Sequence, residues 1–319
     1  MNLQQSGGYP RRDFLKTMTT AGALLPFAAA MAESGKQQPS PKVKRLITIF
    51  SKHLHWLDAQ PLAETVSRIG FDGIDLAVRA KGHVLPERVE QDLPRVVEII
   101  RQAGLQVPMM VTDISKATDP HVEKILKTAS ALGIGYYRTA YLPYDFSKSI
   151  DANLKIFQAQ LQELADMNRH YRIRGACQNH SGVRFSSALW DLWLVLKEIH
   201  SEWLGCQFDI RHAMVEGANT WPISLRALAP FVNTVDIKDS FWSKVDGKWK
   251  IEYCPLGEGM VDFAGFFALL NELGLYTPIS MHYEYDLGLP SDPKLITSQH
   301  QEQVIKVMKK DLSYLRQLV

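Results

Sequence analysis

The chain alternates short runs rich in β-branched and other apolar residues with longer stretches of helical character, and this alternation limits its fold more than any other feature. The short runs predict eight strands, at residues 45–50, 73–78, 106–112, 135–139, 173–178, 205–210, 232–237 and 278–281. The longer stretches predict eight helices, at residues 61–69, 93–103, 120–132, 151–169, 187–200, 221–228, 263–273 and 298–318. Because eight strand-then-helix units in about 270 residues are typical of a (β/α)8 barrel, we predict an α/β fold, with a single TIM-barrel domain over residues 45–319.

The ends of the predicted helices favour the same fold. Several of these helices end in a glycine that leads directly into the next strand, namely Gly70, Gly104, Gly133 and Gly274. A glycine at this point is typical of a left-handed helix cap before a turn. The competing fold, a doubly wound sheet, usually has about five to seven strands and a phosphate-binding loop after the first of them. No G-x-G-x-x-G or G-x-x-x-x-G-K segment follows any predicted strand, so the barrel is the better interpretation.

The N-terminus carries the pattern of an export signal. Residues 11–16 read R-R-D-F-L-K, an apolar run follows at 18–29, and small residues at 28–32 resemble an A-x-A cleavage site. The apolar run is shorter than the roughly 20 residues that span a membrane. We therefore predict a twin-arginine signal over residues 1–32, a linker over 33–44, and a periplasmic protein with no stable membrane anchor after cleavage. A frayed amphipathic helix is the alternative.

Composition limits the partners. The formal net charge is only +2 and part of it lies in the predicted signal, so we expect no nucleic-acid partner. The cysteines Cys177, Cys206 and Cys254 are widely spaced, odd in number and outside any C-x-x-C motif, which is not the pattern of a disulfide framework. We expect buried thiols instead.

Polar residues gather where the last four predicted strands end. These ends read C-Q-N-H-S-G at 177–182, F-D-I-R-H at 208–212, D-I-K-D at 236–239 and H-Y-E-Y-D at 282–286. Barrel active sites lie at the carboxyl ends of strands, and residues two apart on a strand face the same way. Each such residue could separately be a helix cap or a turn residue. Clustering on four consecutive strand ends favours a functional site, in which the inward-facing pairs are Gln178 with His180, Asp236 with Lys238, and His282 with Glu284.

These segments, together with P-L-G-E-G-M-V-D-F at 255–263, carry a family resemblance. The chain resembles the sugar phosphate isomerase/epimerase superfamily of xylose isomerase-like barrels, and the resemblance covers residues 44–319. This superfamily includes ketohexose epimerases, inosose and dehydroshikimate dehydratases, and the endonuclease IV group. It also has an exported branch with a twin-arginine leader, which the N-terminus of this chain resembles.

The resemblance implies one divalent metal ion held at the ends of strands five to eight. Relatives use Glu, Asp, His and Glu there; the matching positions in this chain are Gln178, Asp209, Asp236 and His282. Two carboxylates, an amide and an imidazole suit Mn²⁺, Mg²⁺, Co²⁺ or Zn²⁺ without choosing among them. The resemblance also implies that His212 contacts substrate.

The resemblance implies a proton-transfer mechanism, but Gln178 and His282 stand where relatives have glutamate, so we expect that mechanism to differ here. In the epimerases the two ligand glutamates exchange protons with opposite faces of a sugar carbon, whereas both matching positions here are non-acidic. We therefore expect a proton shift by a single base, or a β-elimination of water, through an enediolate. The candidate proton-transfer and electrophilic groups are Glu284, Lys238, His212 and His180. Aromatic residues near the same strand ends, such as Tyr141, could stack on a sugar.

Three functions are then open. The first is a periplasmic, metal-dependent isomerase, epimerase or lyase acting on a sugar or an oxidised sugar. The second is a non-catalytic sugar-binding barrel that has lost part of the metal site. The third, a phosphodiesterase or endonuclease, needs a trinuclear site rich in histidine, and the weak positive charge and the export signal argue against it. The expected partner is a small carbohydrate, and the oligomeric state, including a homo-oligomer, stays open.

Overall fold

The computed structural model describes residues 44–319 of the chain. The predicted signal of residues 1–32 and the linker residues 33–43 lie outside this range, so both stay predictions. Over residues 44–319, none of the helices is at once long and apolar enough to cross a membrane.

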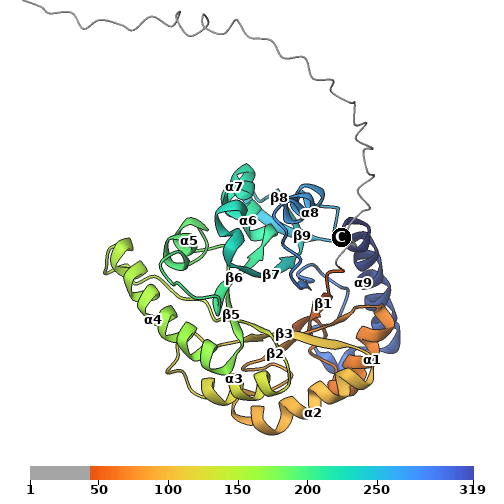
Figure 1. Cartoon of the computed structure of the whole chain (residues 1–319). Helices are drawn as coiled ribbons and strands as arrows, with labels where there is room; N and C mark the ends of the chain where they lie inside the picture. The colour runs from red at the N-terminus through yellow and green to blue at the C-terminus, as the bar shows by residue number, and fades with distance from the viewer. Residues whose placement is uncertain (1–43) are drawn as a thin grey trace, which may run out of the picture. The chain divides into compact units, whose positions relative to one another are not determined.

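Parallel strands close into a barrel, which confirms the predicted fold (Figure 1). Around the barrel the order is β1-β10-β7-β6-β5-β4-β3-β2. The barrel strands are β1 (Ile47–Phe50), β2 (Gly73–Val78), β3 (Gln106–Thr112), β4 (Tyr136–Arg138), β5 (Arg174–Gln178), β6 (Leu204–Asp209), β7 (Val232–Ile237) and β10 (Ile279–Met281). Every one of these strands overlaps a predicted strand. Each strand pairs with its two neighbours, so their carboxyl ends meet at one end of the barrel.

Helices surround the barrel and alternate with its strands in the chain (Figure 1). They are α1 (Ala59–Ile69), α2 (Val89–Gln102), α3 (Val122–Ala131), α4 (Ile150–Tyr171), α5 (Trp190–Leu196), α6 (Ile210–Gly217), α7 (Trp221–Leu228), α8 (Phe263–Glu272) and α9 (Ser298–Leu318). The four glycines predicted as left-handed caps all have positive φ, from 69° at Gly274 to 105° at Gly70. The positive φ explains why each helix can end there and turn into the next segment.

The hydrophobic core lies between the barrel and its helices. In α1 the buried residues Leu62, Val66 and Ile69 follow the helical period and face the strands. Full burial of such a side chain stabilises the fold by about 1.5–3 kcal/mol. Cys177 and Cys206 lie side by side in the β5–β6 register, and all three cysteines are buried thiols, as predicted.

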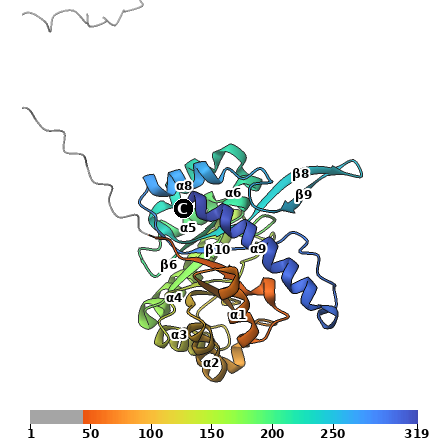
Figure 2. The same ribbon diagram turned by 90° about the vertical axis from the view of Figure 1, so that its right-hand side faces the viewer.

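Two elements differ from the sequence prediction. Helix α6 begins directly at Ile210, because the Asp209 side chain caps it by accepting the backbone N–H of His212 at 3.1 Å. The second element is an antiparallel hairpin, β8 (Asp239–Val245) with β9 (Lys248–Cys254), which projects from the barrel in Figure 2. Its turn residues Asp246 and Gly247 both have positive φ, as a tight hairpin turn requires.

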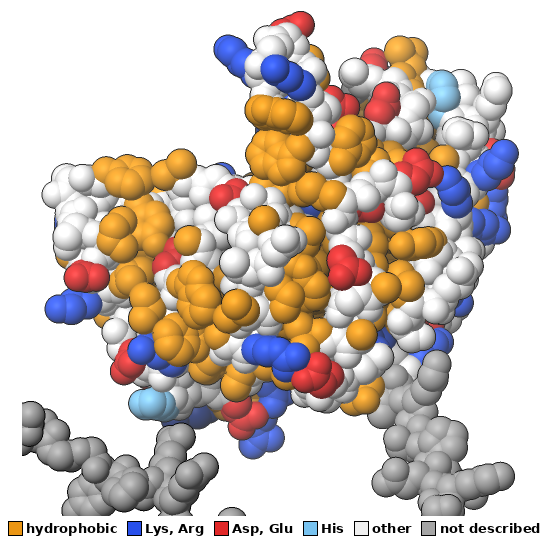
Figure 3. Space-filling view, turned by 90° about the horizontal axis from the view of Figure 1, so that it is seen from above, with side chains coloured by type: hydrophobic (Ala, Val, Ile, Leu, Met, Phe, Trp, Pro, Cys, Tyr) orange, Lys and Arg blue, Asp and Glu red, His pale blue; other side chains and the backbone are white. Residues whose placement is uncertain are grey.

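The hairpin adds to the exposed apolar surface. Four of its aromatic side chains are exposed, with Trp249 the most exposed at 66%. Figure 3 shows hydrophobic side chains distributed over the face of the molecule seen there. No residue of the hairpin lines the cavity described below.

Candidate active site

A cavity of about 170 Å³ lies at the carboxyl ends of the barrel strands. Its lining residues are Phe50, Lys52, Arg79, Arg138, Tyr141, Gln178, His180, Lys238, His282 and Glu284. Four of them, Lys52, Arg79, Arg138 and Lys238, are basic, while Glu284 supplies a carboxylate. The cavity is therefore a cationic environment, suited to an anion or to negative charge that develops during a reaction.

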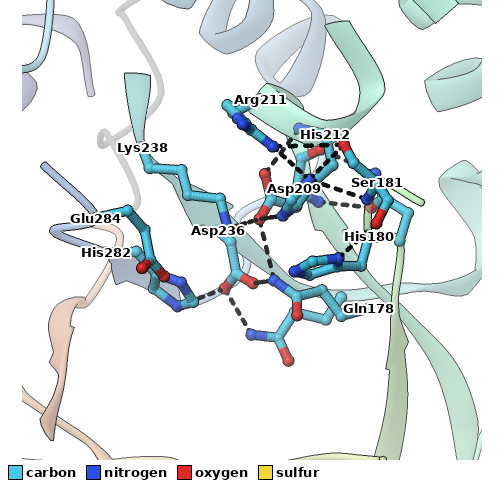
Figure 4. Close-up of polar contacts among 12 residues, drawn as sticks. Gln178, His180, Ser181, Asp209, Arg211, His212, Asp236, Lys238, His282 and Glu284 are labelled. Atoms are coloured by element: carbon cyan, nitrogen blue, oxygen red, sulfur yellow. Dashed lines mark hydrogen bonds and ion pairs between the residues drawn. The ribbon is translucent and has the colours of Figure 1, made fainter. Parts of the chain in front are cut away.

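The structure brings all eight predicted site residues into one neighbourhood (Figure 4). Five of them line the cavity: Gln178, His180, Lys238, His282 and Glu284. The other three, Asp209, Asp236 and His212, are buried next to those five and contact them. Both members of the pairs Gln178–His180 and His282–Glu284 line the cavity, whereas Asp236 is buried near Lys238 and does not line it. His180, Lys238, His282 and Glu284 follow the ends of their strands.

Gln178 contacts four side chains of the site, two of which, Asp209 and Asp236, are labelled in Figure 4. Its Oε1 accepts hydrogen bonds from Arg138 Nη1 at 2.9 Å and from the Tyr141 hydroxyl at 2.6 Å. Its Nε2 donates to Asp209 Oδ2 at 3.0 Å and also to Asp236 Oδ2. A guanidinium has no acceptor, so the amide oxygen must face Arg138 and the amino group must face the two carboxylates.

Lys238 supplies a positive charge to the same carboxylates. Its Nζ lies 2.8 Å from Asp209 Oδ2, and both side chains are buried. Burial by itself would lower the pKa of Lys238, but the nearby Asp209 and Asp236 outweigh it and raise that pKa above its ordinary value. Lys238 therefore stays an ammonium group.

Asp236 is surrounded by donors. Gln207 Nε2 donates to Asp236 Oδ1 at 2.5 Å, and His282 Nε2 lies 3.7 Å from the same oxygen. Burial and the neighbouring Asp209 raise the pKa of Asp236 well above its ordinary value. The two adjacent carboxyl groups are thus stabilised by shared donors beneath the cavity.

His180 is oriented to accept a proton. Its Nδ1 lies 2.9 Å from the backbone oxygen of Ser181, which can only accept, so Nδ1 carries the hydrogen and Nε2 has the free lone pair. Burial lowers the pKa of His180 to about 4, so the imidazole is neutral near pH 7. A neutral imidazole that lines a cavity can serve as a base.

His212 lies behind His180 and does not line the cavity. Its Nδ1 accepts from the Ser181 N–H at 3.0 Å and faces Arg211 Nη1 at 2.8 Å, so its hydrogen is on Nε2, 3.6 Å from Asp209 Oδ2. The two imidazole rings are 4.0 Å apart between centroids. His212 thus contacts His180 and Asp209, and it is a positioning residue in this arrangement.

Glu284 lies on the other side of the cavity from His180, at the end of β10 (Figure 4). Lys52 Nζ contacts its carboxylate at 3.2 Å. Burial acts to raise the pKa of Glu284, but the neighbouring cationic groups, Lys52 and Lys238 among them, outweigh burial and lower it. Glu284 is therefore a carboxylate near pH 7 and can accept a proton.

The predicted metal ligands do not fit a divalent ion as they are arranged. Gln178 turns its amino group, rather than its oxygen, toward Asp209 and Asp236, and the Lys238 ammonium already contacts Asp209. A different group of three, His53, His282 and Glu284, places one ligand atom of each within 4.8 Å of the others. In that group His53 Nε2 already accepts the backbone N–H of Tyr283 at 3.1 Å, and Glu284 already pairs with Lys52.

Two important lining residues escaped the sequence prediction, Arg79 and Arg138. Both had a readable signal: Arg79 directly follows the predicted strand 73–78, and Arg138 lies inside the predicted strand 135–139. Arg79 follows β2 and Arg138 ends β4, whereas the polar clusters that predicted the site follow the last four strands of the barrel. Tyr141, predicted only as a stacking aromatic, instead binds Gln178 through its hydroxyl.

Asp239 and the P-L-G-E-G-M-V-D-F segment have a structural role. The Asp239 carboxylate accepts backbone N–H groups from Gly257 at 2.9 Å, Gly259 at 3.0 Å and Val261 at 3.2 Å. These contacts connect the base of the hairpin to the loop before α8. Glu258 is exposed and pairs with Lys310.

A sequence model described as Xylose isomerase-like TIM barrel matches residues 63–317. The chain belongs to this family. No curated protein matches the chain.

Solved structures support the fold. A 3-keto-D-glucoside 4-epimerase from E. coli matches with a TM-score of 0.64 and 15% identity, covering 86% of this chain and 100% of the epimerase. A D-allulose 3-epimerase from Methylomonas sp. matches at 0.62 and 19%, covering 86% and 98%. A probable 3-DHS dehydratase from Bacillus anthracis matches at 0.62 and 12%, covering 83% and 98%.

Proposed function

We propose that this protein is a sugar isomerase or epimerase that moves a proton at a carbon next to a carbonyl group. The observation that carries the proposal is the pair of proton acceptors, His180 and Glu284, on two sides of one cavity that also presents the Lys238 ammonium. Family membership and the epimerases among the similar structures support it.

The chemistry follows from the positions of these groups. One base, Glu284 or His180, takes the proton from the carbon next to the carbonyl. The C–H electron pair then forms a C=C bond, and the carbonyl π electrons move to the oxygen. The carbonyl oxygen becomes an enediolate oxygen whose negative charge is stabilised by Lys238 and Arg138. Return of a proton from the opposite side inverts the carbon. Its return to the former carbonyl carbon, with transfer of the neighbouring hydroxyl proton to the former carbonyl oxygen, isomerises the sugar. Two bases facing one cavity permit the inversion, which the sequence prediction of a single base did not include.

A lyase is the second candidate, supported by the dehydratase among the similar structures. It shares the first step: after proton removal, the β-hydroxyl takes a proton from the protonated base and leaves as water, instead of the carbon regaining that proton. The same groups serve both reactions, so the product distinguishes them.

We also propose that the reaction takes place in the periplasm. The basis is the R-R-D-F-L-K motif at residues 11–16 with the apolar run and small residues that follow it. A free or oxidised monosaccharide, rather than a sugar phosphate, is the substrate expected in that compartment.

The test is proton exchange. Purified protein is incubated in deuterated water with free ketoses, 3-keto sugars and uronic acids, and loss of the C–H signal is followed by proton NMR. We expect exchange with at least one of them, and a loss of roughly 100-fold or more in Glu284→Gln, since general base catalysis supplies about 10²–10⁴-fold. Appearance of a dehydrated product would identify the lyase.

Glu258→Gln is the matched control, because Glu258 is an exposed carboxylate that also pairs with a lysine. It should keep full exchange. Wild-type exchange rates in Glu284→Gln, with a lower melting temperature, would show that the Lys52–Glu284 pair is only structural. Binding of a sugar without any exchange would identify the barrel as a binding protein.

A further inference from the structure

We infer that this barrel carries its own cation: the Lys238 ammonium takes the place of a divalent metal ion in the buried carboxylate cluster of Asp209 and Asp236. The inference rests on the proposed function for its catalytic part, and on contacts alone for its metal-binding part. It departs from the sequence prediction of a bound divalent ion.

The buried carboxylate cluster needs a positive charge. Asp209 and Asp236 are both fully buried, and buried carboxylates need a partner. Lys238 Nζ meets this need directly, 2.8 Å from Asp209 Oδ2 and with its side chain 4% exposed. A divalent ion bound to the same oxygen would have to displace the ammonium or lie beside it.

The amide atoms of Gln178 are already hydrogen-bonded. Gln178 could bind a metal only through Oε1, but this oxygen accepts from both Arg138 and Tyr141, which matches its two lone pairs. Rotating the amide by 180° would bring its amino group against the Arg138 guanidinium, which has only donors. Arg138 therefore keeps the amino group of Gln178 facing the two carboxylates. This amino group has two hydrogens to donate and no lone pair that could bind a metal.

Further basic side chains surround the cluster. Arg79 and Arg138 line the same cavity as Lys238, so an incoming divalent ion meets several fixed positive charges. A divalent ion at the nearby group of His53, His282 and Glu284 would also meet a positive charge, because Lys52 forms an ion pair with Glu284. Both places are already balanced by basic side chains of the protein.

Lys238 can also contact a substrate in the cavity. Its ammonium is held by Asp209 on one side and also lines the cavity. An ammonium has three N–H donors, so hydrogens remain to bind a substrate oxygen. Lys238 is thus placed to polarise a carbonyl and to stabilise an enediolate oxygen, as a catalytic residue.

The experiment measures metal first, without reference to activity. The protein is produced in medium supplemented with Mn²⁺, Co²⁺, Zn²⁺ and Mg²⁺, dialysed, and analysed by elemental mass spectrometry; its melting temperature is then recorded with each ion. We expect well below one equivalent of metal and an unchanged melting temperature. One retained equivalent, or a rise of several degrees on adding an ion, would overturn the inference.

Two variants test the role of the ammonium. Lys238→Met removes the charge and should now respond to added Mn²⁺ or Mg²⁺ with a higher melting temperature, while Lys310→Met, an exposed lysine that also pairs with a glutamate, should not. The absence of any metal response in Lys238→Met would mean that the ammonium does not stand in for an ion.

Activity separates this inference from the proposed function. If wild type exchanges substrate protons, chelation with EDTA should leave the rate unchanged, and Lys238→Met should lower kcat by roughly 100-fold or more with a smaller effect on KM. Loss of exchange on chelation, restored by one ion, would overturn the inference but keep the proposed function. A metal-free protein that exchanges no substrate proton would keep the inference that no metal binds and overturn the proposed function.

Discussion

At the scale of single residues, Gly259 illustrates how closely the loop before α8 approaches Asp239. A Cβ at this position would lie 2.2 Å from Asp239 Oδ1, far inside contact distance. Gly259→Ala should therefore displace the Asp239 carboxylate from the N–H groups that it accepts and destabilise the fold by about 2 kcal/mol. Urea unfolding measures this change in the free energy of unfolding.

Gly135→Ala is the control, because a Cβ there meets its nearest atom at an ordinary 3.8 Å and φ is not in the left-handed region. Its free energy of unfolding should change by less than about 1 kcal/mol. Equal stabilities of the two alanine variants would mean that the loop shifts without cost and that Asp239 does not hold it.

At the scale of elements, the start of α5 contains a carboxyl group that makes stability depend on pH. Asp191 accepts the Ser186 N–H at 3.0 Å and the Tyr144 hydroxyl at 2.5 Å. Burial raises the pKa of Asp191 from 3.8 to about 6. Between these two values the folded protein binds more protons than the unfolded chain, so the contribution of Asp191 to the free energy of unfolding falls as pH rises.

We predict that Asp191→Asn flattens this dependence. Compared with wild type, its free energy of unfolding should decrease less from pH 4 to pH 7, by up to about 3 kcal/mol. Urea unfolding at several pH values measures the difference, and comparison with wild type cancels the contributions of other buried carboxyls. Asp166→Asn, at an exposed position on α4, should keep the wild-type slope. If the free energy of unfolding of Asp191→Asn and of wild type fell equally with pH, Asp191 would not be the source of this pH dependence.

At the scale of the whole molecule, we predict that the export signal at residues 1–32 directs the protein to the periplasm. Replacing Arg11 and Arg12 by lysine keeps the charge but removes the arginine pair, so the unprocessed chain should stay in the cytoplasm. Cell fractionation with an immunoblot measures the distribution, and Lys36→Arg, outside the predicted signal, is the control. Undiminished processed protein in the periplasm of the double variant would contradict the prediction.

The sequence by itself determined the barrel and indicated where the cavity lies. Strand periodicity and glycine caps are local interactions, so the eight units could be counted without a structure. The polar clusters at the strand ends included Gln178, His180, Lys238, His282 and Glu284, which line the cavity. The β8–β9 hairpin was missed although its Asp246-Gly247 turn is a local signal as well.

Only the tertiary structure decided what the site residues do to one another. Gln178 has the residue type of a metal ligand, but its amide orientation is imposed by Arg138 from the neighbouring strand β4. Lys238 could have paired with Glu284, yet Asp209 binds it and Lys52 binds Glu284. These contacts depend on which donors and acceptors face one another across neighbouring strands. Side chains far apart in sequence form such hydrogen bonds only once the barrel has closed, so no local sequence pattern predicts them.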